Sequence, residues 1–111
     1  SQDSPATVNT TVASTDEGMM VPSEFSLYQN YPNPFNPITT IPFSIPINSD
    51  QNVSIRIYDI KGAIIHTLAN QKFQMGYHNI QWDATHSTNG IYFVELLTTN
   101  NRKVKKLVLL K

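Results

Sequence analysis

Hydrophobic and polar residues alternate along most of the chain from residue 39 onward, and a period of two residues is typical of a half-buried β-strand. The clearest run spans residues 52–59, where Val53, Ile55 and Ile57 occupy every second position. No stretch of useful length shows the 3.6-residue period of an amphipathic helix. The pattern predicts strands over residues 25–29, 39–46, 52–59, 63–69, 77–83, 90–99 and 102–110.

The turns between these runs and the inward-facing positions follow from the same pattern. Asp59 can accept hydrogen bonds from backbone N–H groups and Gly62 can supply a positive φ, so residues 59–62 predict a hairpin turn. Short strands separated by such turns are typical of an all-β sandwich, here of about seven antiparallel strands. The side chains expected to be mostly buried are Val53, Ile55, Ile57, Ile80, Trp82, Ile91 and Phe93.

Residues 31–37 form a proline-rich loop ahead of the second predicted strand. Pro32, Pro34 and Pro37 each fix φ and remove a backbone donor, which excludes a helix or an interior strand. The residues before them are pushed toward extended conformations, so the loop loses little entropy on ordering. We expect Phe35 to pack against the sandwich, with Asn33 or Asn36 bonded to backbone groups.

Charges are segregated along a chain whose formal net charge is zero. Residues 1–24 contain four acids and no base, and their polar composition predicts an extended linker ahead of a domain spanning 25–111. The beginning of the chain lacks the basic start and apolar core of a signal peptide, so for an exported protein we expect a downstream part of a longer chain. This segregation indicates local electrostatics rather than a nucleic-acid surface.

The last predicted strand combines a basic character with an apolar alternation. Val104, Leu107 and Leu109 are expected to hold it on the sheet, or to lie opposite to Lys106 and Val108 if a bulge shifts the register. Lysines that protect an edge strand from aggregation are one explanation for its charge, and steering toward a partner is another. Its basic residues, with no acid among them, are Arg102, Lys103, Lys105, Lys106 and Lys111.

The residue types offer little for catalysis or metal binding. The chain has no cysteine, and its three histidines, His66, His78 and His86, lack metal-ligand spacing. We expect His66 and His78 on the outer faces of strands. The domain has few acids, namely Asp50, Asp59, Asp83 and Glu95, and two of them could form a glycosidase pair. Asp59 and Asp83, however, lie at strand–turn junctions, where capping is the commoner role. We therefore predict neither an enzyme nor a cofactor.

Two binding alternatives remain at this point. Asn48, Asp50 and Asn52 offer side-chain oxygens of the kind that calcium prefers. Trp82 could stack on a sugar ring, although a lone tryptophan beside Ile80 on one face of a strand is more often part of a core.

Taken in order, six segments resemble the type A C-terminal sorting domain of the type IX secretion system, found on exported proteins of Bacteroidetes and neighbouring phyla. The combination is specific in its order, and its structural motif residues are Pro32, Asn33, Pro34, Phe35, Pro37, Asp59, Gly62, Trp82, Gly90 and Tyr92. The segments are FSLYQNYPNPFNP (25–37), TTI (39–41), VSIRIYDIKG (53–62), GYHNIQWD (76–83), NGIYF (89–93) and KKLVLLK (105–111). A related family is the immunoglobulin-like domain of flagellar hook-capping proteins.

The resemblance implies an immunoglobulin-like sandwich that serves as an export address and has no chemistry of its own. It implies an upstream cargo domain in the same chain and recognition by the type IX secretion machinery. It also implies that a surface sortase-like peptidase cuts within residues 1–24, after passage through the periplasm and outer membrane to the cell surface or medium. The alternative is an accessory immunoglobulin-like or carbohydrate-binding module of a secreted enzyme.

Overall fold

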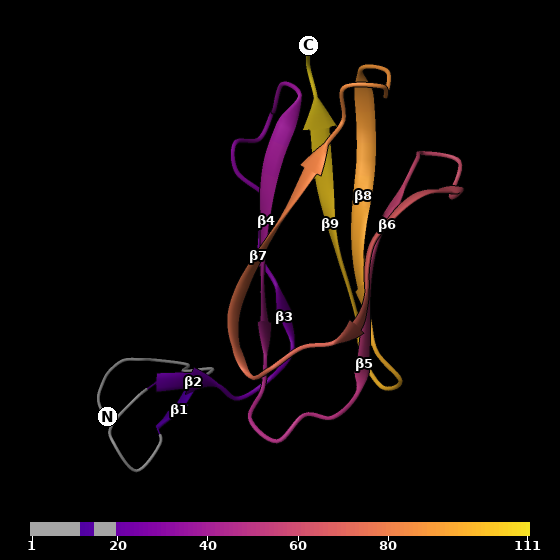
Figure 1. Ribbon diagram of the computed structural model, residues 1–111. Coiled ribbons are helices and arrows are strands. Elements are labelled where there is room, and N and C mark those ends of the chain that lie inside the picture. The colour runs from indigo at the N-terminus through magenta and orange to yellow at the C-terminus, as the bar shows by residue number, and fades with distance from the viewer. Residues whose placement is uncertain (1–11, 15–19) are drawn as a thin grey trace.

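The computed structural model describes residues 12–14 and 20–111, and every regular element in that part of the chain is a β-strand (Figure 1). Two facing sheets form a sandwich, and a separate two-stranded sheet, β1–β2, lies to one side. The strands are β1 (Val12–Ser14), β2 (Met20–Pro22), β3 (Ser26–Leu27), β4 (Ile38–Ile45), β5 (Asn52–Tyr58), β6 (Ile64–Lys72), β7 (Gly76–Asp83), β8 (Gly90–Leu97) and β9 (Arg102–Leu109).

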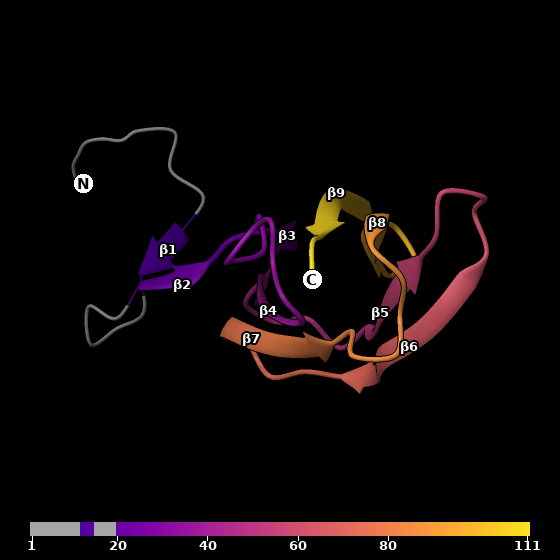
Figure 2. The same cartoon turned by 90° about the horizontal axis from the view of Figure 1, so that it is seen from above.

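The sandwich contains seven antiparallel strands, as the sequence predicts. One sheet has the order β3-β4-β7 and the other β6-β5-β8-β9, and Figure 2 shows the two sheets enclosing the interior. It differs from a constant-type immunoglobulin sandwich, in which the fourth strand joins the sheet of the first two, because β6 stays paired with β5. The edges are β3 and β7 in one sheet and β6 and β9 in the other.

The core lies between the sheets and is centred on aromatic rings. Val53, Ile55 and Ile57 are completely buried, and Trp82 is 1% exposed, which confirms these core predictions. The indole packs against the Phe35 ring at a centroid distance of 5.5 Å and against the Tyr92 ring at 5.2 Å. Aromatic pairs at these separations add to the stability that burial alone supplies.

The inward face of β8 was assigned wrongly from the sequence. Ile91 is 41% exposed and Phe93 is only half-buried, whereas Tyr92, Val94 and Leu96 face the core. Both faces of β8 are apolar apart from a single glutamate, so alternation alone cannot choose between the two registers.

Val104 and His78 lie on the opposite faces of their strands to those expected from the sequence. In β9 the register with β8 is continuous and contains no bulge, so Val104 faces outward and is 39% exposed, while Leu107 and Leu109 are fully buried. On β7, Ile80 is half-buried, and His78 lies across from Phe43 and stacks on its ring at 5.3 Å. The expectation that His78 sits on an outer face is therefore wrong.

Element lengths deviate most where the chain is irregular. The first predicted strand, 25–29, shrinks to the two residues of β3, because β3 pairs only with Ser44 and Phe43 of β4. The hairpin strand expected over 63–69 extends to Lys72 and pairs with β5 through two irregularities in register.

Residues just before the predicted domain contact the sandwich. Val21 and Pro22 are buried, and the Pro22 carbonyl accepts a hydrogen bond from the Ile47 N–H at 3.3 Å. The Glu24 carbonyl accepts one from the Ser44 hydroxyl at 3.2 Å. The division into a linker (1–24) and a domain (25–111) stays a prediction, and much of that linker lies outside the described residues.

Candidate functional site

The proline-rich loop pairs with the end of β9. Phe35 donates its N–H to the Val108 carbonyl at 2.9 Å, and its own carbonyl accepts from the Leu110 N–H at 3.0 Å. Asn33 accepts from the Val108 N–H through its side-chain oxygen at 3.0 Å. The Phe35 ring is 1% exposed, so the predicted packing of Phe35 and the predicted backbone bond of Asn33 are confirmed. The loop therefore acts as a short neighbouring strand for this part of the edge.

A buried polar cluster fixes the shape of the loop. Asn30 is 3% exposed and donates from its amide to the Pro32 carbonyl at 3.1 Å and to the Thr39 hydroxyl at 2.8 Å. Thr39 in turn donates to the Pro32 carbonyl at 3.0 Å. The Tyr31–Pro32, Asn33–Pro34 and Asn36–Pro37 bonds are cis. Sequence reasoning missed Asn30, although an asparagine and a threonine bracketing a donor-free proline run was an available signal.

The first half of β9 has no such cover. Outward-pointing backbone groups belong to alternate residues of an edge strand, and on β9 these include Val104, Lys106 and Val108. The Lys106 carbonyl accepts from the Gln29 amide at 2.8 Å, but the backbone edge of Val104 has no hydrogen-bond partner among residues 20–111. A groove of about 340 Å³ runs beside it between β3 and β9, lined by Ser26, Leu27, Tyr28, Lys103, Val104 and Lys105.

The five basic residues of the terminal segment divide into two groups. Arg102 donates from Nε to Glu95 at 2.6 Å, and the Lys111 ammonium donates to the Thr85 carbonyl at 2.7 Å. Lys103, Lys105 and Lys106 make no ion pair within the described part of the chain. Their charges lie beside the uncovered half of the β9 edge, while Arg102 and Lys111 are tied to the domain.

Two motif residues from the resemblance have structural roles. Tyr92, near the start of β8, donates its hydroxyl to the Thr88 carbonyl at 2.5 Å, an arrangement known as the tyrosine corner of immunoglobulin-like domains. Asp59 accepts from the N–H groups of Lys61 and Ala63 at 2.9 and 3.0 Å, and Gly62 has a φ of +85°. The predicted hairpin turn is therefore present.

A carboxylate to which the sequence analysis gave no structural role lies in the middle of the four-stranded sheet. Glu95 of β8 is 3% exposed and accepts from the Tyr58 hydroxyl at 2.8 Å, in addition to its bond from Arg102. Arg56 approaches the same carboxylate, with Nε 3.6 Å from Oε1. The hydrogen bond to Glu95, together with burial, raises the pKa of Tyr58. The sequence signal for this site was a single glutamate inside the otherwise apolar strand β8.

No set of side chains in the described ranges suggests metal chemistry. No group of three or more His, Asp or Glu residues there could hold an ion. Asn52, one of the three residues considered for calcium, donates its amide N–H to the Asn70 side-chain oxygen. Asp83 accepts from the backbone N–H of Thr85 at 3.0 Å and caps that turn, as expected from its position. Within the same residues no helix is long and apolar enough to cross a membrane.

Comparison with known families distinguishes a sorting domain from an accessory binding module. Residues 29–110 match the family described as the secretion system C-terminal sorting domain. The chain belongs to that family. No curated protein and no solved structure matches it with significance. The match spans the proline-rich loop, both sheets of the sandwich and nearly all of the terminal segment.

Membership in the sorting domain family establishes the general role of the chain. The sorting domain is a secretion signal of the type IX system, and the machinery of that system recognises it. A protein that carries it is exported to the cell surface or secreted. The family is non-catalytic, and the burial of Trp82 leaves no exposed indole for stacking on a sugar.

Proposed function

We propose that this sorting domain directs an upstream cargo in the same chain across the outer membrane for attachment to the cell surface, and that the machinery reads the uncovered half of β9. The observation that carries the proposal is the contrast along one strand edge. The proline-rich loop covers the part around Val108, while the part around Val104 keeps its backbone groups available.

The chemistry of this edge suits strand addition. An extended segment of a partner can pair with an open sheet edge through main-chain hydrogen bonds. The groove between β3 and β9 gives such a segment room for side chains. Lys103, Lys105 and Lys106 would steer it if the partner surface is acidic, because opposite charges accelerate encounter. The loop supports the other half of the strand at little additional entropic cost on binding.

The rest of the proposed pathway is what the resemblance to the family implies. The cargo reaches the periplasm by a cleavable signal peptide, and the folded sorting domain is recognised there. A surface sortase-like peptidase then cuts within residues 1–24 and joins the cargo to a surface anchor. In this scheme the domain is a substrate and a ligand.

The test uses a reporter that carries a signal peptide, fused ahead of residues 1–111, in a host with the type IX system. Replacing Lys103, Lys105 and Lys106 by Gln should leave the reporter in the periplasm while the domain melts like the parent. Surface charge changes usually alter stability by less than about 0.5 kcal/mol each. The control replaces Lys61 and Lys72, two exposed lysines elsewhere in the domain, by Gln and should be exported normally.

The outcomes separate the parts of the proposal. Parental export of a stably folded triple variant would mean that these lysines only protect an edge, and the machinery would then read another surface. Periplasmic retention of the parent fusion itself would contradict the proposed role of this chain in export. Mass spectrometry of the released reporter locates the cut, and a cut outside residues 1–24 would contradict the assignment of the linker.

A further inference from the structure

The solvent-facing side of the four-stranded sheet carries a group of apolar and aromatic side chains among its polar residues. Outer faces of antiparallel sandwiches are commonly polar. Here the cross-strand register places Tyr58 of β5 beside Phe93 of β8, and Glu95 of β8 beside Val104 of β9. Next to them Ile60 is 71% exposed. Among the residues that the structure describes, nothing covers this face, and exposed apolar surface rimmed by polar groups marks interaction sites.

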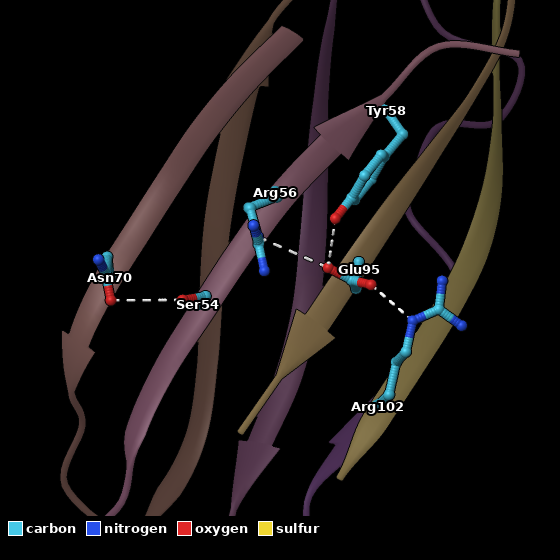
Figure 3. Close-up of polar contacts among 6 residues, drawn as sticks. All are labelled: Ser54, Arg56, Tyr58, Asn70, Glu95 and Arg102. Atoms are coloured by element: carbon cyan, nitrogen blue, oxygen red, sulfur yellow. Dashed lines mark hydrogen bonds and ion pairs between the residues drawn. The ribbon is translucent and has the colours of Figure 1, made fainter. Parts of the chain in front are cut away.

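An ion pair network around the buried carboxylate of Glu95 lies on the same face. Figure 3 shows Glu95 between Tyr58 and Arg56 on one side and Arg102 on the other. The carboxylate is fully engaged, with Tyr58 on Oε1 and Arg102 on Oε2. Such a network restrains its arginines. A restrained guanidinium loses less conformational freedom when it binds a further group.

Arg102 has hydrogen-bond donors that the network does not use. Arg56 and Arg102 pair with the Glu95 carboxylate, and a second carboxylate, that of Asp59, lines the same cavity. Arg102 uses only Nε for that pair, and in residues 20–111 its Nη groups have no hydrogen-bond partner. The Arg102 side chain is 65% exposed, so these donors are accessible. Asp59, the other acid nearby, uses its Oδ1 to cap the turn.

A cavity of about 350 Å³ connects the apolar side chains to these donors. Its size is at the lower end of the range typical of ligand pockets. Its lining combines aromatic and aliphatic side chains with the arginine, and arginine and tyrosine are enriched at the energetic centres of protein interfaces. The lining residues are Tyr58, Asp59, Ile60, Gly62, Phe93, Glu95, Arg102 and Val104.

We propose that this outer-face pocket docks a segment of a protein partner that presents an aspartate or glutamate carboxylate beside an apolar side chain. The carboxylate pairs with the free Nη fork of Arg102, for which a planar two-oxygen group is the natural complement. The apolar side chain covers Phe93 and Val104. The pocket lies on the face of the sheet, whereas the groove beside β9 lies at its edge, so the inference adds a second contact. It rests on the proposed function only for placing the partner in the export machinery.

The first experiment is a ¹⁵N NMR titration of residues 1–111 with the peptide acetyl-Leu-Asp-Leu-amide. We expect millimolar peptide to shift the amide signals of Phe93, Glu95 and Val104. The matched peptide acetyl-Leu-Asn-Leu-amide should bind about tenfold more weakly, since hydrogen bonds to charged groups are stronger than those between neutral groups by about that factor. Absence of shifts at these three amides, or equal binding of both peptides, overturns the inference.

Two variants with the same kind of change test the location. Val104→Thr keeps a β-branched side chain in the pocket but adds a polar hydroxyl, and should weaken binding of the aspartate peptide severalfold. Ile38→Thr makes the corresponding change on the other sheet, at an outer position that is 45% exposed, and should leave the titration unchanged. Equal weakening by both variants, or by neither, overturns the assignment to this pocket.

The export assay distinguishes this inference from the proposed function. A parent fusion that is exported while residues 1–111 bind neither peptide keeps the proposed function and removes the pocket. Binding of the aspartate peptide by a domain that is not exported keeps the pocket and removes the proposed function. Concentration-dependent shifts of the same amides without any peptide, with dimer in sedimentation, would identify a second copy as the occupant and overturn the partner proposed here.

Discussion

Replacing Phe35 by Ala removes the aromatic ring through which the proline-rich loop joins the core. The ring is 1% exposed and packs on Trp82, and the backbone of Phe35 bonds to Val108 and Leu110. The substitution leaves these backbone bonds possible and deletes only the side chain. The effect therefore measures how much of the domain depends on the buried ring.

The magnitude follows from burial and from the space left behind. Removing a fully buried Phe loses about 2–3 kcal/mol of transfer free energy. Incomplete collapse of the cavity raises the cost of Phe→Ala substitutions to about 3–5 kcal/mol. With Trp82 on one side and a backbone bridge to Leu109 on the other, little collapse is available, so we expect about 4 kcal/mol. A small domain with a total stability of about 5–15 kcal/mol would then be close to unfolding.

Urea denaturation followed by tryptophan fluorescence measures this loss, because Trp82 is the single tryptophan and touches the deleted ring. The midpoint should fall strongly while the m-value stays unchanged. Tyr31→Ala, in the same loop but 55% exposed, is the control and should cost less than about 0.5 kcal/mol. A loss below about 1 kcal/mol for Phe35→Ala would refute the claim that the loop is part of the core.

Two other changes test individual polar contacts. Tyr92→Phe keeps the buried ring but removes the hydroxyl that bonds to the Thr88 carbonyl, so thermal unfolding should show a loss of about 1–2 kcal/mol; no loss would contradict the role of the tyrosine corner. The Thr85 hydroxyl and N–H lower the pKa of Asp83, so its contribution to stability is present above the unfolded pKa of about 3.9 and is lost as pH falls through the folded value. The melting temperature of Asp83→Asn should therefore depend less on pH below about pH 4 than that of the parent. Parallel curves of melting temperature against pH for variant and parent would contradict the assignment.

The accuracy of the sequence predictions depends on how unambiguous each alternation is. Strand β5 has apolar residues on one face only, so Val53, Ile55 and Ile57 were placed correctly. Strand β8 is apolar on both faces, and its register is set by Tyr92, whose hydroxyl needs the Thr88 carbonyl, and by Glu95. These are tertiary contacts that a single strand does not encode.

Lys103 and Lys105 explain the misplacement of Val104. An inward-facing β9 position was expected to be apolar, so Val104 was favoured over its charged neighbours. In the structure Lys103 and Lys105 share the inward side with Leu107, beside the short strand β3, where the sandwich is open. Long lysine side chains can lie along an apolar edge with their charge in water. The position of this opening depends on the length of β3, which no local pattern predicts.

The packing of β9 has a consequence for the order in which a signal of this kind is made. Leu107 and Leu109 are completely buried, and the backbone of Phe35 in the proline-rich loop bonds to Val108 and Leu110. A ribosome that stalls before residue 107 leaves the sandwich without one edge and the loop without its neighbour. Synthesis runs from the N-terminus, so the sandwich can close only after residues 107–109 have left the ribosome and paired with β8. Folding of the domain is therefore a late step, well after its first strands have been made.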